Sequence, residues 1–316
     1  MYILYTKVKI FSRGHSYKDM RKNICFEGVG TAIVTPQKDG EIDYAALSKI
    51  IDMQICAGIN AIIVGGTTGE SATLSDYERE KLYSFAAEKI NKRTKLILGT
   101  GSCDTAKAVR YTKAAKQLGA DGALCITPYY NKGTEGGLYQ HFLAIAEADD
   151  ISTVIYNVPT RTCVNLSLES LGRLCEHENI AGLKESSDSI KRISELASFG
   201  EALPLYSGND YANFIFYSLG AKGAISVISN LYPTQTKRVY ELSLCRKFSE
   251  ALALQNDMNP LIDALFLETN PSVVKFAMER HGLCSSDVRL PLSAPSSKTR
   301  EMLAIALEKY EKTLHG

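Results

Sequence analysis

The chain has 316 residues, 45% of them hydrophobic, and a formal net charge of +1 at pH 7. This length suits one barrel domain with an appendage, or two domains. A charge so close to zero excludes a general electrostatic attraction to nucleic acid or to an anionic membrane, and no run reaches the roughly 18 apolar residues that span a bilayer. We therefore expect a globular protein that acts on small molecules.

Eight cysteines and five histidines are scattered along the chain without a C-x-x-C pair or an H-E-x-x-H sequence. This spacing argues against a zinc site and against a disulfide framework. Several cysteines lie inside apolar patterns, where a free thiol behaves as a small hydrophobic side chain. We expect no metal ion and a location in the reducing cytoplasm.

Residues 1–23 differ from the rest because they carry six Lys or Arg residues against one acidic residue, Asp19. Their apolar runs are too short for a signal peptide. We interpret this basic extension as disordered, or as the result of a translation start assigned upstream of the true one, since Met20 stands just before the first convincing strand. A transit-like leader is the alternative.

From residue 28 onward, short apolar runs rich in β-branched residues alternate with helical patterns. The runs predict eight strands: Gly30–Val34, Ala61–Val64, Lys95–Gly99, Gly122–Ile126, Thr153–Tyr156, Ala181–Lys184, Pro204–Tyr206 and Gly223–Val227. The patterns between them predict helices such as Asp43–Ala57, Tyr77–Ile90, Thr105–Leu118 and Gly136–Ala148, and Ser75 with Glu78 forms a capping box. Eight such units close a (β/α)8 barrel, which we place at residues 24–232. A doubly wound open sheet is the competitor, but no G-x-G-x-x-G follows the first strand.

The strand pattern stops after the eighth unit. Residues 233–316 instead predict further helices, including Ser272–Arg280 and Lys298–Lys312. Each has an apolar face to bury. The region is therefore a C-terminal helical extension that either caps the same chain or forms an oligomer surface.

Lys184 ends a short apolar run, Gly182-Leu183-Lys184-Glu185-Ser186, where a buried strand meets a loop. Burial lowers a lysine pKa, and the neutral amine is the form that attacks carbonyl groups. The position therefore indicates Schiff-base chemistry, although many such lysines are ordinary surface residues. Side chains alternate along a strand, so Gly182, Lys184 and Ser186 are expected on one face and Ala181, Leu183 and Glu185 on the other.

In a barrel the active site lies at the carboxyl ends of the strands, and polar residues follow several of the predicted strands. The glycine-rich turn after Val64 carries Thr67 and Thr68, whose amides and hydroxyls suit a carboxylate, although a plain tight turn is the simpler interpretation. Paired tyrosines including Tyr130 follow the fourth strand, and Tyr156 ends the fifth, with Arg161 shortly beyond. Tyrosines there often only pack, but one facing a lysine can pass protons. Arg161 is either a surface residue or a fork for a second carboxylate.

The ordered motifs of the chain resemble those of the pyruvate-dependent class I aldolases and lyases. The resemblance runs from about Gly28 to Leu292 and includes these segments: Gly66-Thr67-Thr68-Gly69-Glu70-Ser71-Ala72-Thr73-Leu74, Thr127-Pro128-Tyr129-Tyr130-Asn131-Lys132, Tyr156-Asn157-Val158-Pro159, Gly182-Leu183-Lys184-Glu185, Ser207-Gly208-Asn209-Asp210, Glu268-Thr269-Asn270-Pro271 and Arg289-Leu290-Pro291-Leu292. Within the family, the paired threonines, the double tyrosine and Arg161 favour the synthases that condense pyruvate with L-aspartate 4-semialdehyde in lysine and diaminopimelate biosynthesis.

The resemblance implies a role for each candidate residue and requires no cofactor. Lys184 forms an imine with pyruvate, and Tyr156 is the acid/base above it. A proton relay runs from Tyr156 through the Thr67 hydroxyl to Tyr130, which reaches across a two-fold interface within a homotetramer built as a dimer of dimers. The remaining implied residues bind substrate: the amides of Thr67 and Thr68 hold the pyruvate carboxylate, Arg161 holds the semialdehyde carboxylate, and Gly208 and Ile225 line the site through backbone groups.

The chain departs from the family pattern in two loops and at the site where lysine-sensitive relatives bind their inhibitor. Gly133 stands in place of a proline and Cys163 in place of a glycine, which bears on loop rigidity more than on chemistry. The resemblance places Asp76, Cys103 and Lys107 where those relatives hold lysine with a histidine, an asparagine and a glutamate. Because Lys107 replaces a carboxylate, we expect no feedback inhibition by L-lysine at physiological concentrations. The alternative is that lysine binds in a shifted pose through Asp76.

Two other functions remain open at this stage. The first is an aldolase for a keto-sugar acid, such as N-acetylneuraminate lyase, which uses the same lysine and tyrosine. Arg161 counts against it, because a sugar chain needs hydroxyl partners more than a second carboxylate clamp. The second is a barrel that senses a small molecule without turnover, which has no need for the lysine, tyrosines and threonine together.

Overall fold

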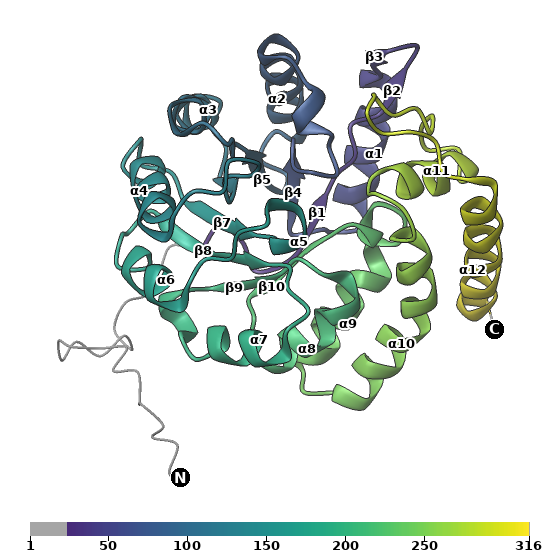
Figure 1. Ribbon diagram of the computed structural model, residues 1–316. Helices are drawn as coiled ribbons and strands as arrows, with labels where there is room; N and C mark the ends of the chain where they lie inside the picture. Colours follow the sequence, from purple (N-terminus) through teal and green to yellow (C-terminus); the bar gives the residue numbers. More distant parts are fainter. Residues whose placement is uncertain (1–23, 316) are drawn as a thin grey trace.

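The computed structural model describes residues 24–315, so the expectation for the basic extension lies outside the described residues. Eight parallel strands close into a barrel in the order β1-β10-β9-β8-β7-β6-β5-β4 (Figure 1). They are β1 Gly28–Ala32, β4 Ala61–Val64, β5 Lys95–Gly99, β6 Gly122–Ile126, β7 Thr153–Asn157, β8 Ile180–Glu185, β9 Leu205–Ser207 and β10 Gly223–Ser226. The predicted (β/α)8 barrel is confirmed, the open sheet is excluded, and the strand bounds differ from the prediction by two residues at most.

Helices surround the barrel and continue into the C-terminal region (Figure 1). The α-helices are α1 Tyr44–Cys56, α2 Asp76–Ile90, α3 Thr105–Gln117, α4 Glu135–Ala146, α5 Pro159–Thr162, α6 Leu168–Leu174, α7 Ile190–Ala197, α8 Asn213–Ser218, α9 Pro233–Leu244, α10 Phe248–Leu265, α11 Ser272–Arg280 and α12 Ser297–His315, and the 3₁₀ turns are η2 Ser71–Thr73, η3 Gly200–Ala202, η4 Asp210–Ala212 and η5 Ile228–Asn230. The capping box predicted from Ser75 and Glu78 is present at the start of α2.

A short hairpin precedes α1 and was not expected from the sequence. Its strands, β2 Gln37–Lys38 and β3 Glu41–Ile42, pair antiparallel around Asp39 and Gly40, which both have positive φ. An Asp-Gly pair suits such a turn because both central residues must adopt left-handed conformations. Two residues per strand are too few to give an alternating pattern, so the turn dipeptide was the only signal available.

The hydrophobic core has two layers, one between the strands and the helices and one inside the barrel. Ile155 and Leu183 belong to the outer layer. Inside, Phe26 and Tyr206 pack with ring centroids 4.7 Å apart, and the Tyr206 hydroxyl donates to the Phe26 carbonyl at 2.6 Å. Both side chains are buried, so this part of the interior is filled by packing rather than left open to a ligand.

A β-bulge between β7 and β8 sets which side chains of β8 face inward. Thr153 pairs with Ile180 but Val154 pairs with Gly182, so Ala181 is the extra residue. Ala181 packs in the inner core layer and Leu183 in the outer one. The prediction that the two side chains share one face of the strand is therefore wrong. Beyond the bulge Lys184 pairs with Tyr156.

The C-terminal helices pack against the barrel as part of one core. α9 contacts β1 and α8, and α10 contacts α8, α9 and α12. Buried residues of α10 and α12, such as Leu261 and Leu303, join the outer core layer. The division of the chain at residue 232 therefore remains a proposal. No helix among residues 24–315 is long and apolar enough to cross a membrane.

Candidate active site

Lys184 lies inside the barrel, one residue before the end of β8, and is only 6% exposed. Its Nζ atom lies 4.1 Å from the ring centroid of Tyr156, the residue paired with it on β7. Burial lowers the pKa of the Lys184 ammonium, because the charged form loses its hydration, and the positive charge of Arg161 lowers it further. Tyr156 and Asp210 act in the opposite direction. The arrangement therefore favours a neutral amine beside a tyrosine hydroxyl group.

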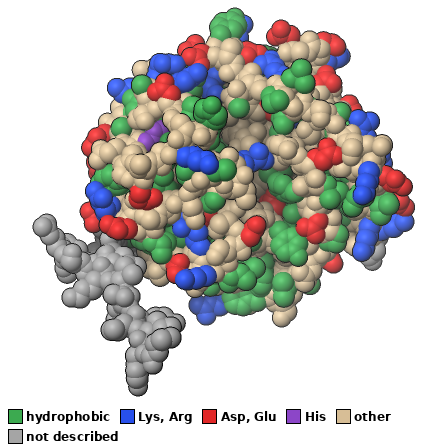
Figure 2. Space-filling view, in the orientation of Figure 1, with side chains coloured by type: hydrophobic (Ala, Val, Ile, Leu, Met, Phe, Trp, Pro, Cys, Tyr) green, Lys and Arg blue, Asp and Glu red, His purple; other side chains and the backbone are tan. Residues whose placement is uncertain are grey.

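A cavity of about 310 Å³ opens beside this pair. Tyr156, Thr67 and Arg161 line it, together with Tyr129 and residues of the C-terminal region such as Asn270. The face shown in Figure 2 is hollowed near its centre, over the barrel. Lys184 lies behind the Tyr156 ring and is not itself among the lining residues. Arg161 comes from α5, whose first residue is Pro159, a favoured residue for the start of a helix.

The loop after β4 places both candidate threonines and holds its shape through its own backbone. The amides of Gly69 and Glu70 donate to the carbonyls of Gly66 and Thr67 at 3.1 and 3.0 Å. Thr68 is buried, and its Oγ1 atom accepts a hydrogen bond from Asn270 at 2.9 Å. Glu70, in a left-handed conformation with φ 54°, is buried and pairs with Lys275 at 2.7 Å. These contacts hold the turn at the wall of the cavity, which Glu70 and Asn270 both line.

Gly208 follows β9 and lies directly against the lysine. Its amide donates to the Glu185 carbonyl at 2.8 Å, and its carbonyl accepts from the Ser186 hydroxyl at 3.0 Å. A Cβ atom at this position would lie 2.1 Å from the Ser186 Oγ and 2.8 Å from the Lys184 Cε, so only glycine allows this approach. Ile225 on β10 is 2% exposed and packs in the inner core layer with Tyr156.

Within this chain, Tyr130 does not lie beside the other candidate site residues. Its side chain is 92% exposed, and it has a positive φ of 74° in the loop after β6. Its neighbour Tyr129 lines the cavity instead. The predicted relay through Tyr130 therefore stays a prediction, and its partner would have to come from outside the described chain.

The two loop departures lie at the surface. Gly133 and Cys163 are both exposed. Cys163 ends α5 with φ 56°, a left-handed conformation that suits glycine and costs other residues roughly 1 kcal/mol. The family pattern has glycine at this position because glycine adopts the left-handed conformation without strain. In this chain the conformational cost of Cys163 destabilises the end of α5, the helix that carries Arg161.

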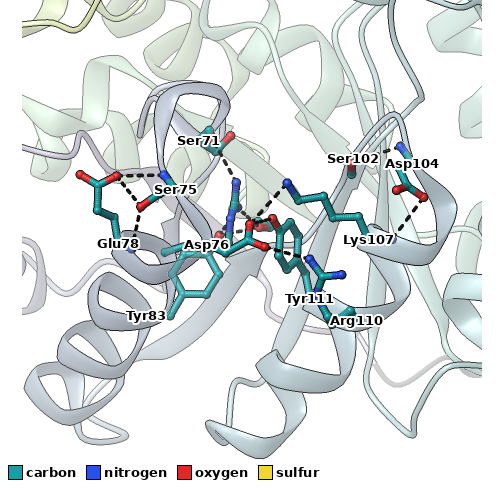
Figure 3. A network of polar contacts seen from close by, with 12 residues as sticks. Ser71, Ser75, Asp76, Glu78, Tyr83, Ser102, Asp104, Lys107, Arg110 and Tyr111 are labelled. Atoms are coloured by element: carbon teal, nitrogen blue, oxygen red, sulfur yellow. Dashed lines mark hydrogen bonds and ion pairs between the residues drawn. The ribbon is translucent and has the colours of Figure 1, made fainter.

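A polar network lies between α2 and α3 (Figure 3) and adjoins the cavity through Arg79 and Ser71. Asp76 accepts from Arg110 at 2.9 Å and from the Tyr111 hydroxyl, and it pairs with Lys107 at 3.3 Å. The hydrogen bond from Tyr111, with the two cations, lowers the pKa of Asp76. Cys103 is exposed and interacts with the side chain of Tyr129, which with burial raises the pKa of Tyr129.

Arg79 belongs to the same network and was missed by sequence analysis. It is 7% exposed, lines the cavity, and stacks 4.5 Å from the ring centroid of Tyr111. Its guanidinium donates to Tyr83 and to the carbonyls of Gly99 and Ser71. The available signal was its place three residues after Asp76, on the same face of α2.

Two further residues were given no role by the sequence analysis, although Asn270 belongs to one of its motifs and Lys275 to the predicted helix Ser272–Arg280. Asn270 and Lys275 come from the C-terminal region, more than 200 residues from the loop they contact. No local pattern in the sequence could pair segments so far apart. Among residues 24–315, no three His, Cys, Asp or Glu side chains are placed to hold a metal ion.

Comparison with known proteins gives consistent matches over nearly the whole chain. The model of the dihydrodipicolinate synthetase family matches residues 25–310. A 4-hydroxy-tetrahydrodipicolinate synthase of Clostridium novyi (strain NT) is 42% identical over 289 residues, which cover 91% of this chain and 98% of the relative.

Solved structures give the same result. The crystal structure of dihydrodipicolinate synthase from Aquifex aeolicus has a TM-score of 0.89 and 42% identity over 90% of this chain and 98% of that one. A structure described as the first monomeric dihydrodipicolinate synthase variant has a TM-score of 0.88 and 40% identity, over 91% of this chain and 97% of its own.

Proposed function

The chain belongs to the dihydrodipicolinate synthetase family, and we infer that it is a lyase of lysine and diaminopimelate biosynthesis. It condenses pyruvate with L-aspartate 4-semialdehyde to form 4-hydroxy-tetrahydrodipicolinate. The observation that carries this function is a lysine buried in a barrel, with a lowered pKa and a tyrosine ring 4.1 Å away. We place the enzyme in the cytoplasm.

The proposed reaction begins with the neutral amine of Lys184. The amine attacks the ketone carbon of pyruvate, and loss of water leaves an imine. The imine withdraws electrons, so a methyl proton can leave and an enamine forms. The enamine carbon attacks the aldehyde carbon of the semialdehyde, and the amino group of that substrate then attacks the imine carbon. Ring closure expels Lys184, which returns as the free amine.

The other candidate residues divide between proton transfer and substrate binding. Tyr156 lies over the amine and donates and accepts protons as the imine forms and breaks, with the Thr67 hydroxyl as the next group in the relay. The amides of Thr67 and Thr68 hold the pyruvate carboxylate. Arg161, at the exposed side of the cavity, holds the carboxylate of the incoming semialdehyde. The backbones of Gly208 and Ile225 border the reacting carbon.

Borohydride trapping tests the lysine assignment. Reduction in the presence of pyruvate should add one pyruvate-derived mass to the peptide that carries Lys184, and the Lys184→Ala variant should gain none. Labelling of a different lysine would contradict the mechanism. A coupled assay that compares the semialdehyde with N-acetylmannosamine as second substrate separates this synthase from a keto-sugar-acid aldolase, and turnover of either excludes a sensor without activity.

We further propose a homotetramer built as a dimer of dimers. The exposed Tyr130, in its left-handed backbone conformation, supports a first interface that completes the relay in the neighbouring subunit. Exposed apolar side chains on α7, η4 and α8 support a second one: Ile190, Tyr211, Ile215 and Leu219. Figure 2 shows hydrophobic side chains gathered at the lower edge of the face, where α7 and α8 lie in Figure 1. A similar structure described as a monomeric variant means that the oligomer has to be measured.

Subunit mixing tests the first interface. Tyr130→Phe and Lys184→Ala subunits should each be inactive alone, and mixed dimers should regain activity because one site then combines an intact Lys184 with an intact Tyr130. Sedimentation of the mixture confirms that mixed dimers are present. If such dimers stay inactive, Tyr130 does not act across an interface.

A further inference from the structure

Asn270 joins the C-terminal region to the carboxylate-binding loop. It lies just before α11, and its Nδ2 atom donates to the Oγ1 atom of Thr68 at 2.9 Å. Both residues are buried, with 6% and 3% exposure. Asn270 lines the cavity, and Thr68, which it contacts, lies in the chain segment between two lining residues, Thr67 and Glu70. A direct contact between two buried polar side chains that are 202 residues apart is specific rather than a consequence of chain proximity.

With the amide nitrogen of Asn270 toward Thr68, the Oδ1 atom of Asn270 is buried without a hydrogen-bond partner, and the threonine acts as the acceptor of this pair. A hydroxyl has one proton to donate and two lone pairs to accept with. Because the amide of Asn270 donates to Thr68, one lone pair is occupied and the hydroxyl proton is left for a different acceptor. A ligand carboxylate is such an acceptor, since an ionised carboxylate only accepts.

Neighbouring contacts hold Asn270 in place. Lys275, one turn into α11, pairs with Glu70 at 2.7 Å, and both side chains have zero exposure. The ammonium of Lys275 also donates to the Thr35 carbonyl at 3.1 Å. Glu70 accepts in addition from the backbone amide of Arg289 at 3.0 Å. These contacts join the start of α11 to the end of the loop that carries Thr67 and Thr68. They therefore hold the amide of Asn270 close to Thr68.

We propose that Asn270 is a positioning residue for pyruvate binding: its amide orients the Thr68 hydroxyl so that the proton of Thr68 is donated to the pyruvate carboxylate. The proposal rests on the proposed function, which places the backbone amide of Thr68 at that carboxylate, and it adds the side-chain hydroxyl of the same residue. Asn270 itself touches Thr68, and its effect on pyruvate is transmitted through that residue.

Two substitutions separate positioning from support of the fold. Asn270→Ala removes the donor and should raise the KM for pyruvate roughly tenfold, as expected when a hydrogen bond to a charged group is lost. Asn270→Asp keeps the shape but replaces the donor with an acceptor, so the Thr68 proton turns toward residue 270 and a second negative charge lies beside the substrate. Its KM for pyruvate should rise further, while the KM for the semialdehyde stays unchanged in both variants.

A double-mutant cycle tests whether the effect passes through Thr68. Thr68→Val should raise the pyruvate KM, and adding Asn270→Ala to it should change nothing more. Asn259→Ala, which removes an asparagine of α10 that bonds within its own helix, is the control and should leave both KM values at the wild-type level. Thermal unfolding of each variant establishes that the proteins compared are folded.

If the folded Asn270→Asp variant has the pyruvate KM of the wild type, the proposal is overturned. It is also overturned if Asn270→Ala raises the pyruvate KM by the same factor in the wild type and in the Thr68→Val variant. If Thr68→Val itself leaves the pyruvate KM unchanged, the Thr68 hydroxyl does not bind the carboxylate and the proposal is overturned, whereas the assignment of the Thr68 backbone amide is not affected. The proposed activity is judged separately, by borohydride trapping on Lys184.

Discussion

Lys184 sits between opposing electrostatic influences. Burial and the positive charge of Arg161 lower the pKa of its ammonium, whereas Tyr156 and Asp210 raise it. Asp210 is itself buried and accepts from the amides of Val227 and Ile228 at 2.8 and 2.9 Å, so its charge is fixed in place. An amine used for nucleophilic attack needs a pKa near the working pH. The balance among these groups therefore bears directly on the fraction of reactive amine.

Replacing Arg161 should have two separable effects. Arg161→Ala removes the proposed clamp for the second substrate, so the KM for the semialdehyde should rise roughly 10- to 100-fold, as expected for one or two hydrogen bonds to a charged group. The variant also loses a cation that lowers the pKa of Lys184, so the acid limb of imine formation should move to higher pH. Steady-state kinetics and trapping across pH measure the two effects, and a variant that no longer traps pyruvate at any pH would refute the assignment.

His141 should make the stability of the fold depend on pH. It is 4% exposed between α3 and α4, bonded to the Thr105 hydroxyl at 2.9 Å, and burial lowers its pKa to about 4. The unfolded chain binds a proton near pH 6.5, so the unfolding free energy should fall as pH drops from 6.5 to 4, by up to about 3 kcal/mol. His141→Gln keeps a hydrogen-bonding group but cannot titrate. Its denaturant midpoint should vary less over this range than that of the wild type, and equal slopes would contradict the prediction.

At the scale of elements, the C-terminal region stabilises the active-site loop after β4 by direct contacts. Arg289 extends the contacts of Asn270 and Lys275, because it donates to the Thr73 carbonyl at 3.1 Å and pairs with Glu78 at 2.5 Å. The hydrogen bond from Arg289 lowers the pKa of Glu78 to about 2. The segment from Thr67 to Glu78 is therefore held from outside the barrel by residues 270–289.

The contribution of the buried Lys275–Glu70 ion pair to stability can be tested with single and double substitutions. Lys275→Met leaves the Glu70 carboxylate buried without a cation, which should cost about 3 to 5 kcal/mol of unfolding free energy. Glu70→Gln added to Lys275→Met removes that charge and should restore most of the loss. Lys312→Met, which breaks an exposed pair with Glu308 at 2.7 Å, is the control and should leave the denaturant midpoint unchanged. A double variant as unstable as the single one would show that the charge itself is not the cause.

The sequence predicted the eight barrel strands but neither the short β2–β3 hairpin nor the contacts between distant elements. Strand and helix periods predicted the barrel, and the order of motifs along the strands placed Lys184 and Tyr156 correctly beside each other. Strict alternation failed at Ala181, because a bulge adds a residue without leaving a mark in the hydrophobic pattern. The partners of Thr68 and Glu70 could not be found either, since they depend on how a distant helix docks.

At the scale of the whole molecule, the proposed catalytic residues do not all meet within one chain. Lys184, Tyr156 and Thr67 belong to one barrel interior and its cavity, whereas Tyr130 is exposed and does not line that cavity. An exposed tyrosine in a left-handed backbone conformation is unfavourable in an isolated chain. In the proposed dimer, Tyr130 lies at an interface next to Tyr129, whose side chain interacts with Cys103.

The polar network around Asp76 predicts insensitivity to L-lysine. In lysine-sensitive relatives the resemblance places a histidine, an asparagine and a glutamate at the positions of Asp76, Cys103 and Lys107. Here Asp76 is already engaged by Lys107 at 3.3 Å and Arg110 at 2.9 Å, so its charge is not available to a ligand ammonium. Arg79 lines the cavity nearby and adds a further positive charge.

Initial rates at saturating pyruvate should therefore show no inhibition by L-lysine up to about 10 mM, because an approaching diamine meets repulsion where those relatives offer a carboxylate. Lys107→Glu removes one of the two cations that pair with Asp76 and reverses one charge at the site, so this variant should gain measurable inhibition. Lys113→Glu makes the same charge change elsewhere on α3 and should not. Half-inhibition of the wild type below roughly 1 mM would mean that lysine binds despite the local positive charge, and the electrostatic argument would be wrong.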